Sequence, residues 1–486
     1  MTRLTRGLLT RRTHWQTEIV MKRIGQLFLF AILIVIFTLT TMAQPNSLRV
    51  GVAAVSITPP NGTPLAGYYR KRLSEGVLDD IHAKAMVFEQ NGVKAAIVVC
   101  DILTFPRKTV VTARELIEKQ MGIPGANVMI AATHSHTSPV VSGENTRDAL
   151  DGGDTEAALN YSAELPKRIA QSVAEANQKL APMRLSATIA HEDGVSFNRR
   201  FWMRDGSVSW NPPKQDKNII KTAGPIDPDI GFLHFETLKE EPVAAFVNFA
   251  LHLDTTGGQK ISSDFPGHLA RLLSQVKGAN FQTVFATGAC GNINHRDINW
   301  KDNQKGVGES FRIATALAGA INTSWSGLQP LTDTTVQVRS EIVKLPLAPI
   351  TEADITKARE VYQRITNPKT TFPEQVNAFK VLDIVNRNGQ PLEVEVQVIA
   401  IGKDVAFVSL PGEVFVELGQ SIKKASPFKY TMIIELANGS IGYIPNKSAY
   451  PESNYEVWSA RCAAGSGELL VSAATKLLSE LLSPVR

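Results

Sequence analysis

Two histidines separated by one residue, His134 and His136, are the first candidates for chemistry in this sequence. They follow the apolar run Asn127 to Ala132 almost directly, and such a run is typical of a buried strand. In an extended segment residues i and i+2 point to the same side, so both imidazoles could face one pocket. Imidazole is a frequent zinc ligand and a frequent proton carrier. The alternative interpretation is a pair of polar loop histidines bonded to the backbone.

His252 and Glu413 are further candidates, because each follows an apolar run that predicts a strand. These runs are Val243 to Ala250 and Val405 to Leu410. A lone histidine after a strand is often only a hydrogen-bonded core residue, and a carboxylate at a strand-to-helix elbow can simply begin a helix. With His134 they could instead form a shared metal site, since zinc favours histidine nitrogen together with a carboxylate.

A glycine-punctuated turn, GACGNIN at residues 288–294, follows another predicted strand, Phe281 to Thr287. Turns of this kind expose backbone N–H groups that can hold an oxyanion. The segment matches neither a phosphate-binding loop nor the G-x-S-x-G nucleophile elbow. The pattern therefore excludes a nucleotide site and a classical serine hydrolase at this position.

A mixed α/β fold is expected to position these residues, with β-sheets flanked by helices and the site at strand ends. Residues 94–100, 106–121 and 127–132 predict a strand, a helix and a strand, which together make a crossover unit. Residues 335–347 and 392–402 alternate with period two, which predicts half-exposed antiparallel strands, and Gly412-Glu413 is expected to open a helix. Other elements are expected as strands at 50–57, 183–190, 230–236, 243–250 and 281–287, and as helices at 154–178 and 468–482.

Composition excludes several classes of function. The chain has 486 residues, 43% of them hydrophobic and 20% charged, as in an ordinary globular protein. Six basic residues and one acidic residue before position 44 account for the whole formal charge of +5. The remainder has no basic excess, so nucleic-acid binding is not expected. Three cysteines are too few for a disulfide framework or a cysteine-rich zinc cluster.

The N-terminal segment predicts export. An uncharged apolar run, Leu27 to Leu39, follows Met21-Lys22-Arg23 and precedes a small-x-small site that ends at Ala43. This is the pattern of a signal peptide, so residues 1–43 are assigned to a signal region with Met21 as the expected start. The run is shorter than the roughly 20 residues of a spanning helix. We expect a secreted or periplasmic protein, or a membrane-anchored one if the signal stays uncleaved.

Six segments resemble, in order, the signatures of the neutral/alkaline (non-lysosomal) ceramidase family. They are VGVAAVSITP at 50–59, THSHTSP at 133–139, Asn198-Arg199, SSDFPG at 262–267, PGE at 411–413, and Gly442-Tyr443-Ile444 paired with Tyr455-Glu456. The resemblance runs from about Leu48 to the end of the sequence. Residues 48–486 are therefore expected to form a ceramidase-like catalytic domain, without the β-sandwich that usually follows it in the family.

The resemblance implies an exported zinc-dependent amidohydrolase, which cleaves the N-acyl bond of ceramide or a related N-acyl lipid into a fatty acid and a sphingoid base. Its partner is then a lipid-like small molecule, and peripheral contact with a membrane is compatible with it. It implies one Zn²⁺ ion per chain with four ligands: His134, His252, Glu413 and Tyr443. It also implies three residues at the scissile amide: His136, Arg199 and Tyr455.

The implied chemistry is coherent. A zinc ion lowers the pKa of a bound water to about 7 and polarises the carbonyl. Arg199 or Tyr455 could then stabilise the oxyanion, and His136 could carry the proton to the departing amine.

Ser56 stands where the family usually has aspartate, and the glycine-punctuated segment departs further from the family pattern. Its G-D-V-S-P-N motif appears as GNINHR at 291–296, so Asn294 stands in the place of the serine and Asn292 in that of the aspartate. Gly291, Asn292 and Asn294 remain candidates for a substrate or oxyanion loop, but a serine-dependent mechanism is excluded.

Two alternatives therefore stay open. One is a zinc hydrolase of a different amide or ester, and the other is an inactive ceramidase-like binding protein. A deep apolar pocket would favour a lipid substrate, and a shallow polar one the different substrate.

Overall fold

The computed structural model describes residue 21, residues 47–143 and residues 146–482. The chain divides into two units, Met1–Ser47 and Leu48–Arg486, and the second contains the whole of the fold described below. The expected signal region lies outside the described residues except for Met21. Among the described helices, none combines the length and the apolar character needed to traverse a bilayer.

Two mixed β-sheets form the centre of the second unit. The larger has nine strands, with parallel pairing between β4 and β5 and between β12 and β14. Its order is β14 (Gln282–Thr287), β12 (Pro242–Phe249), β11 (Asp229–Thr237), β6 (Ala181–His191), β1 (Arg49–Ser56), β3 (His82–Gln90), β4 (Val93–Cys100) and β5 (Val128–Ala132), with β16 (Gln329–Pro330) paired to β6. The smaller sheet has the order β17 (Val336–Leu345), β18 (Leu392–Ile401), β19 (Val405–Ser409) and β21 (Tyr430–Ile434).

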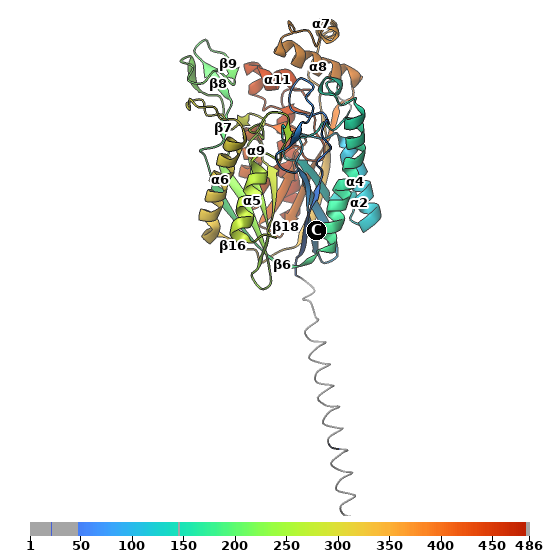
Figure 1. The fold of residues 1–486 in the computed structure, drawn as a ribbon, viewed down its shortest axis with the longest axis vertical. Coiled ribbons are helices and arrows are strands. Elements are labelled where there is room, and N and C mark those ends of the chain that lie inside the picture. The colour runs from blue at the N-terminus through green and yellow to red at the C-terminus, as the bar shows by residue number, and fades with distance from the viewer. Residues whose placement is uncertain (1–20, 22–46, 144–145, 483–486) are drawn as a thin grey trace, which may run out of the picture. The chain divides into compact units, whose positions relative to one another are not determined.

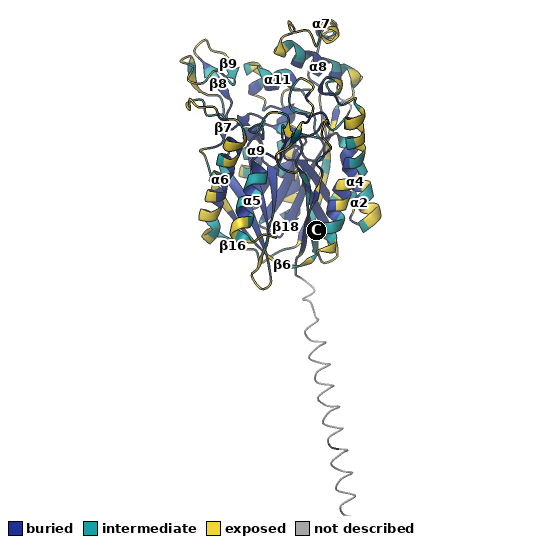
Figure 2. Cartoon of the chain, in the orientation of Figure 1, coloured by how far each residue is buried: buried dark blue, intermediate teal, exposed yellow. Residues whose placement is uncertain are grey.

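The main core lies between the two sheets, where apolar side chains from both sheets form one buried cluster. Phe407 of the smaller sheet contacts Phe88 and Phe246 of the larger one, with ring centroids 6.1 and 4.9 Å apart. Burying such aromatic side chains is among the largest contributions to folding stability. The buried strands and the exposed outer faces of the helices are visible in Figure 2.

Helices cover the outer face of each sheet, which gives four layers (Figure 1). The larger sheet is covered by α2 (Arg107–Met121), α4 (Glu156–Gln178), α5 (Phe265–Lys277) and α6 (Val307–Ser324). The smaller sheet is covered by α9 (Val416–Ala425) and α12 (Ser466–Leu482). The expected α/β architecture with mixed sheets and flanking helices is therefore confirmed, including the β4–α2–β5 crossover.

Further strands and helices lie at one end of the sheets (Figure 1) and contribute loops to the site. The strands are β2 (Gly76–Val77), β7 (Phe197–Asn198), β8 (Arg200–Met203), β9 (Val208–Trp210), β10 (Ile219–Thr222), β13 (Lys260–Ile261), β15 (Ile293–Asn294), β20 (Glu413–Val414) and β22 (Tyr443–Ile444). The helices are α3 (Asp148–Asp151), α7 (Glu352–Gln363), α8 (Phe372–Asn386), α10 (Ala449–Glu452) and α11 (Tyr455–Ser459).

Two expectations for local structure were wrong. Strand β18 is almost wholly buried rather than half exposed, because it lies between β17 and β19 and is covered on both faces. One of its alternating polar residues, Glu395, is buried and accepts a hydrogen bond from Nη1 of Arg114 at 2.8 Å. Glu413 does not open a helix. Its backbone pairs with β22, and α9 begins only at Val416.

Candidate metal centre

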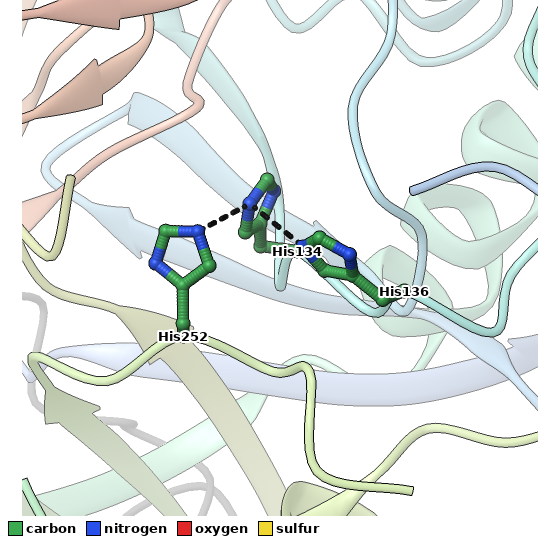
Figure 3. A group of neighbouring side chains, drawn as sticks. All are labelled: His134, His136 and His252. Carbon is green, nitrogen blue, oxygen red and sulfur yellow. Dashed lines mark hydrogen bonds between the residues drawn. The ribbon is translucent and has the colours of Figure 1, made fainter. Parts of the chain in front are cut away.

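Three histidine side chains converge where two strands end. His134 and His136 follow β5, and His252 follows β12. The Nε2 atom of His134 lies 3.1 Å from that of His252 and 3.4 Å from that of His136. Figure 3 shows the three rings turned toward one another. The backbone at His134 is not extended as expected, since its φ is +78°, yet both rings still face the same point.

A backbone carbonyl fixes each of these rings from behind. The Nδ1 atoms of His134, His136 and His252 lie 3.0 Å from the carbonyl oxygens of Leu103, Gly67 and Cys290, respectively. With Nδ1–H donating to its carbonyl, each ring in its neutral form carries the lone pair on Nε2. This is the outer contact that orients histidines in metal sites.

Glu413 points its carboxylate at the same place. Its buried Oε2 atom lies 3.3 Å from Nε2 of His134 and 3.4 Å from Nε2 of His252, and it accepts no hydrogen bond from any described residue. Ligands of a tetrahedral zinc ion, at about 2.0–2.1 Å from the metal, lie roughly 3.3 Å from one another. The observed spacing therefore fits a small metal ion held by nitrogen and oxygen.

The protonation states in the cluster suit a cation. Burial lowers the pKa of His136 to about 3 and that of His252 to about 4, so both rings are neutral at neutral pH. Burial alone would raise the pKa of Glu413, but His134 and His252 hold it well below its usual range. Burial likewise opposes the charged form of His134, yet Glu413 raises its pKa. The cluster thus attracts positive charge.

Tyr443 and Arg199 lie beside Glu413. Tyr443 pairs with Glu413 in the register of β20 and β22, and its hydroxyl accepts a hydrogen bond from Nη2 of Arg199 at 3.1 Å. Arg199 also donates through Nη2 to the carbonyl oxygen of Gly291 at 2.6 Å and through Nε to Glu456 at 2.9 Å. The guanidinium is therefore held in one orientation.

Tyr455 lines the same cavity as His136 and His252, at the first position of α11. Its ring lies 5.2 Å from that of Tyr443 and 4.6 Å from that of Trp210. Burial raises the pKa of Tyr455 well above its usual value, so its hydroxyl stays protonated. Because no described residue is hydrogen-bonded to this hydroxyl, it is available to a ligand.

The buried carboxyl group of Glu435 connects two segments that contribute to the site. It follows β21, and its carboxylate accepts hydrogen bonds from the backbone N–H groups of Cys290 and Val414 and from the thiol of Cys290. Burial raises its pKa to about 8. Glu435 was missed in the sequence, although it too stands directly after an apolar strand. The three cysteines, Cys100, Cys290 and Cys462, are buried and unpaired.

A cavity of about 430 Å³ opens above the cluster. Six of the sequence-predicted residues line it: His136, Arg199, His252, Asn294, Tyr443 and Tyr455. His134 and Glu413 contact the lining residues from behind. The rest of the wall, which no sequence motif indicated, is partly aromatic, with Tyr69, Trp210 and Phe372, and partly polar or charged. The cavity is thus neither purely apolar nor purely polar.

Gly291 and Asn292 do not line the cavity. The N–H of Gly291 donates to the carbonyl oxygen of Val414 at 2.8 Å. The side chain of Asn292 donates to Glu417 and accepts from the backbone N–H of Val416, both at 2.9 Å. In the structure these two residues hold the segment that carries Glu413, while the N–H of Gly291 is already used.

We predict that Gly291→Ala weakens metal binding about 10- to 100-fold, the range typical of changes to the groups that support a metal ligand. A Cβ at Gly291 would lie 2.5 Å from the carbonyl oxygen of Glu413, so β20 must move. Metal competition with a chromophoric chelator measures the affinity. Gly319→Ala in α6, where a Cβ meets nothing within 4 Å, is the matched control. Unchanged affinity in Gly291→Ala would contradict this prediction.

In this layered α/β fold, three histidines and a carboxylate converge beneath a cavity in an arrangement that could hold a metal ion. The family model described as neutral/alkaline non-lysosomal ceramidase, N-terminal, matches residues 48–299, just over half of the chain. The chain belongs to this family, and the resemblance seen in the sequence is confirmed. The membership supports an amidohydrolase.

Solved structures show the same fold. The neutral ceramidase from Pseudomonas aeruginosa is 17% identical, with a TM-score of 0.69 over 91% of this chain and 76% of that one. A ceramidase complexed with C2 is also 17% identical, with a TM-score of 0.71 over 90% of this chain and 75% of that one. No curated protein sequence matches the chain.

Proposed function

We propose that the protein is a zinc-dependent amidase, which hydrolyses the N-acyl bond of ceramide or a related N-acyl lipid to a fatty acid and an amine. One observation carries the proposal: the Nε2 lone pairs of His134 and His252 and the Oε2 atom of Glu413 face one point at mutual distances of 3.1–3.4 Å. Family membership supports the reaction class.

The proposed ligands are His134, His252, Glu413 and Tyr443. Glu413 Oε2 is close to both of these histidines, and Tyr443 stands opposite Glu413 in the β20–β22 pair. Nitrogen and oxygen donors of this kind are typical of zinc. When bound, zinc would supply a Lewis acid and lower the pKa of a water molecule.

The residues of the cavity wall would then assist amide cleavage. The Nε2 atom of His136 would carry a proton toward the departing amine, and Asp254, 4.0 Å from Nδ1 of His136, favours the protonated ring. The Tyr455 hydroxyl would donate a hydrogen bond to the oxyanion, with Arg199 held beside it. Asn294 has its side-chain NH₂ bonded to Asn211, so it is proposed only as a wall of the substrate site.

Substrate access and location are also part of the proposal. The aromatic wall of Tyr69, Trp210 and Phe372 suits an acyl chain, because such rings present apolar area. Export is proposed from the basic and apolar segment before Gln44. A lipid substrate would bring the protein into peripheral contact with a membrane.

Hydrolysis of a short-chain fluorescent ceramide by the purified protein tests the proposal. We expect release of the fatty acid, loss of the activity with a zinc chelator, and recovery when zinc is added back. Activity that withstands complete removal of zinc would contradict the zinc mechanism. Zinc binding without turnover of any N-acyl amide would favour the inactive binding protein.

His136→Ala separates proton transfer from metal binding. We expect the variant to retain its zinc while kcat falls about 10²- to 10⁴-fold, as for loss of a general acid–base residue. Elemental analysis and steady-state kinetics provide the two measurements. Loss of zinc from this variant would instead place His136 among the ligands.

A further inference from the structure

Three cations on the wall of the cavity have no role in the proposed amide cleavage. Lys214, Arg296 and Lys305 line the same cavity as His136 and Tyr455. In the described part of the chain, no salt bridge involves any of the three. An apolar acyl chain gains nothing from such a wall, and the neutral hydroxyl groups of a sphingoid base can be hydrogen-bonded without three positive charges.

Neutral groups anchor two of these cations. The ammonium of Lys214 donates to the carbonyl oxygen of Asp302 and to the side chain of Gln304, both at 2.6 Å. Nη1 of Arg296 donates to the carbonyl oxygens of Asn211 and Pro212, at 3.1 and 2.8 Å. These bonds fix the positions of the charges without neutralising them.

The two charges repel each other. Burial and the neighbouring charge of Arg296 lower the pKa of Lys214, and burial lowers that of Arg296. An anion placed between them would relieve the repulsion and form charge-assisted hydrogen bonds.

Three carboxylates, Asp297, Glu309 and Asp302, favour the charged form of Lys214, but none of them lines the cavity. Glu309 forms a bidentate pair with Arg312, at 2.9 and 2.7 Å. Asp302 accepts from the indole N–H of Trp300, and Asp297 accepts from the backbone N–H of Asn299.

Asp254 is the one carboxylate among the residues that line the cavity, and it accepts a hydrogen bond from the hydroxyl of Tyr68. It also faces His136, Lys305 and His295. Against this single negative charge stand Lys214, Arg296 and Lys305, so the wall keeps an excess of positive charge.

We propose that the preferred substrate is an N-acyl amide whose amine portion carries an anionic group, such as a sulfonate or a phosphate. Lys214, Arg296 and Lys305 bind the anion, and the aromatic wall takes the acyl chain. This proposal rests on the amidase function proposed above and specifies its substrate class.

Two amides with the same acyl chain test it. N-Dodecanoyltaurine and N-dodecanoylethanolamine differ only in a sulfonate in place of a hydroxyl, and N-dodecanoyl-phosphoethanolamine supplies the phosphate arm. We expect kcat/KM for at least one anionic amide to exceed that for the neutral one by about tenfold or more, the scale of one charge-assisted hydrogen bond. The anionic amide with the higher kcat/KM identifies the preferred anion. If kcat/KM for each anionic amide is equal to or lower than that for the neutral amide, the proposal is overturned.

Variants test whether Lys214, Arg296 and Lys305 cause the preference for the anionic amide. In the triple variant Lys214→Gln, Arg296→Gln, Lys305→Gln we expect the ratio of kcat/KM for the anionic amide to that for the neutral one to fall to near one, mainly through a higher KM. Lys305→Gln alone, at an exposed position, should lower the ratio in part without risk to folding. Lys301→Gln lies on the same loop but outside the cavity, and it should leave the ratio unchanged. An unchanged ratio in both cavity variants overturns the proposal.

Failure of the amidase function would be distinguishable. If no amide is cleaved, the amidase proposal fails, and calorimetric binding of N-dodecanoyltaurine decides the charge proposal. Binding by the unmodified protein that the triple variant loses would support the anion site, and absence of binding would overturn it.

Discussion

Replacing His134 or His252 with alanine is expected to remove the bound zinc and to lower kcat/KM for amide hydrolysis by about a thousandfold or more, because several kcal/mol of transition-state stabilisation depend on the metal. The Nε2 atoms of these two histidines are 3.1 Å apart, and both lie within 3.4 Å of Glu413 Oε2. Removing either ring leaves too few donors to hold the ion. Elemental analysis of the purified variants and kinetics with a fluorescent ceramide measure the two effects.

The control for these variants is His191→Ala. His191 is exposed at the end of β6 and its nearest ionic partner is Asp193. Zinc content and turnover should both stay at the level of the unmodified protein. Full zinc content in His134→Ala or His252→Ala would contradict the proposed ligand set, while zinc loss in His191→Ala would show that the assay reports on general instability.

Glu456→Ala is expected to lower the free energy of unfolding by about 3–5 kcal/mol, the cost of removing one partner from a buried ion pair. The fully buried carboxylate of Glu456 accepts from Nε of Arg199 at 2.9 Å and from Nη1 of Arg200 at 2.8 Å. Without it, the buried guanidinium of Arg199 loses its counter-ion, and that of Arg200 keeps only the partly exposed Glu452. Urea unfolding followed by circular dichroism measures the change.

Glu452→Ala provides the comparison. Glu452 contacts the same Arg200, at 3.1 Å, but its side chain is 17% exposed and Arg200 keeps its bond to Glu456. We expect a loss of only about 1 kcal/mol, the upper range for a partly exposed pair. Equal losses of unfolding free energy in the two variants would contradict the prediction that Glu456 is the main counter-ion here. Because Glu456 also holds Arg199, its variant should lose turnover beyond its loss of stability.

Much of the site could be predicted from strand ends. His134, His252 and Glu413 each follow a largely apolar run, and buried strands of this kind are recognisable from local sequence. The family resemblance added Tyr443, Arg199 and Tyr455, which no local rule identifies. Tyr443 belongs to a strand of only two residues, whose pairing with Glu413 is a tertiary contact.

The remaining features depend on tertiary packing. Strand β18 alternates polar and apolar residues as a half-exposed strand does. Its Glu395 is nevertheless buried, because it accepts a hydrogen bond from Arg114. The cavity wall combines Lys214 and Phe372, which come from separate loops and helices without a shared sequence pattern. The expected helix does not begin at Glu413, because the backbone of Glu413 pairs with Gly442 and Tyr443 ahead of α9.

The most direct test of the central claim is stoichiometric reconstitution. Zinc is removed from the purified protein with a chelator, the chelator is dialysed away, and ceramide hydrolysis is measured as zinc is added in fractions of an equivalent. We expect activity that rises linearly and stops rising at one zinc ion per chain. Full activity before any zinc is added, or activity that does not respond to zinc, would contradict it.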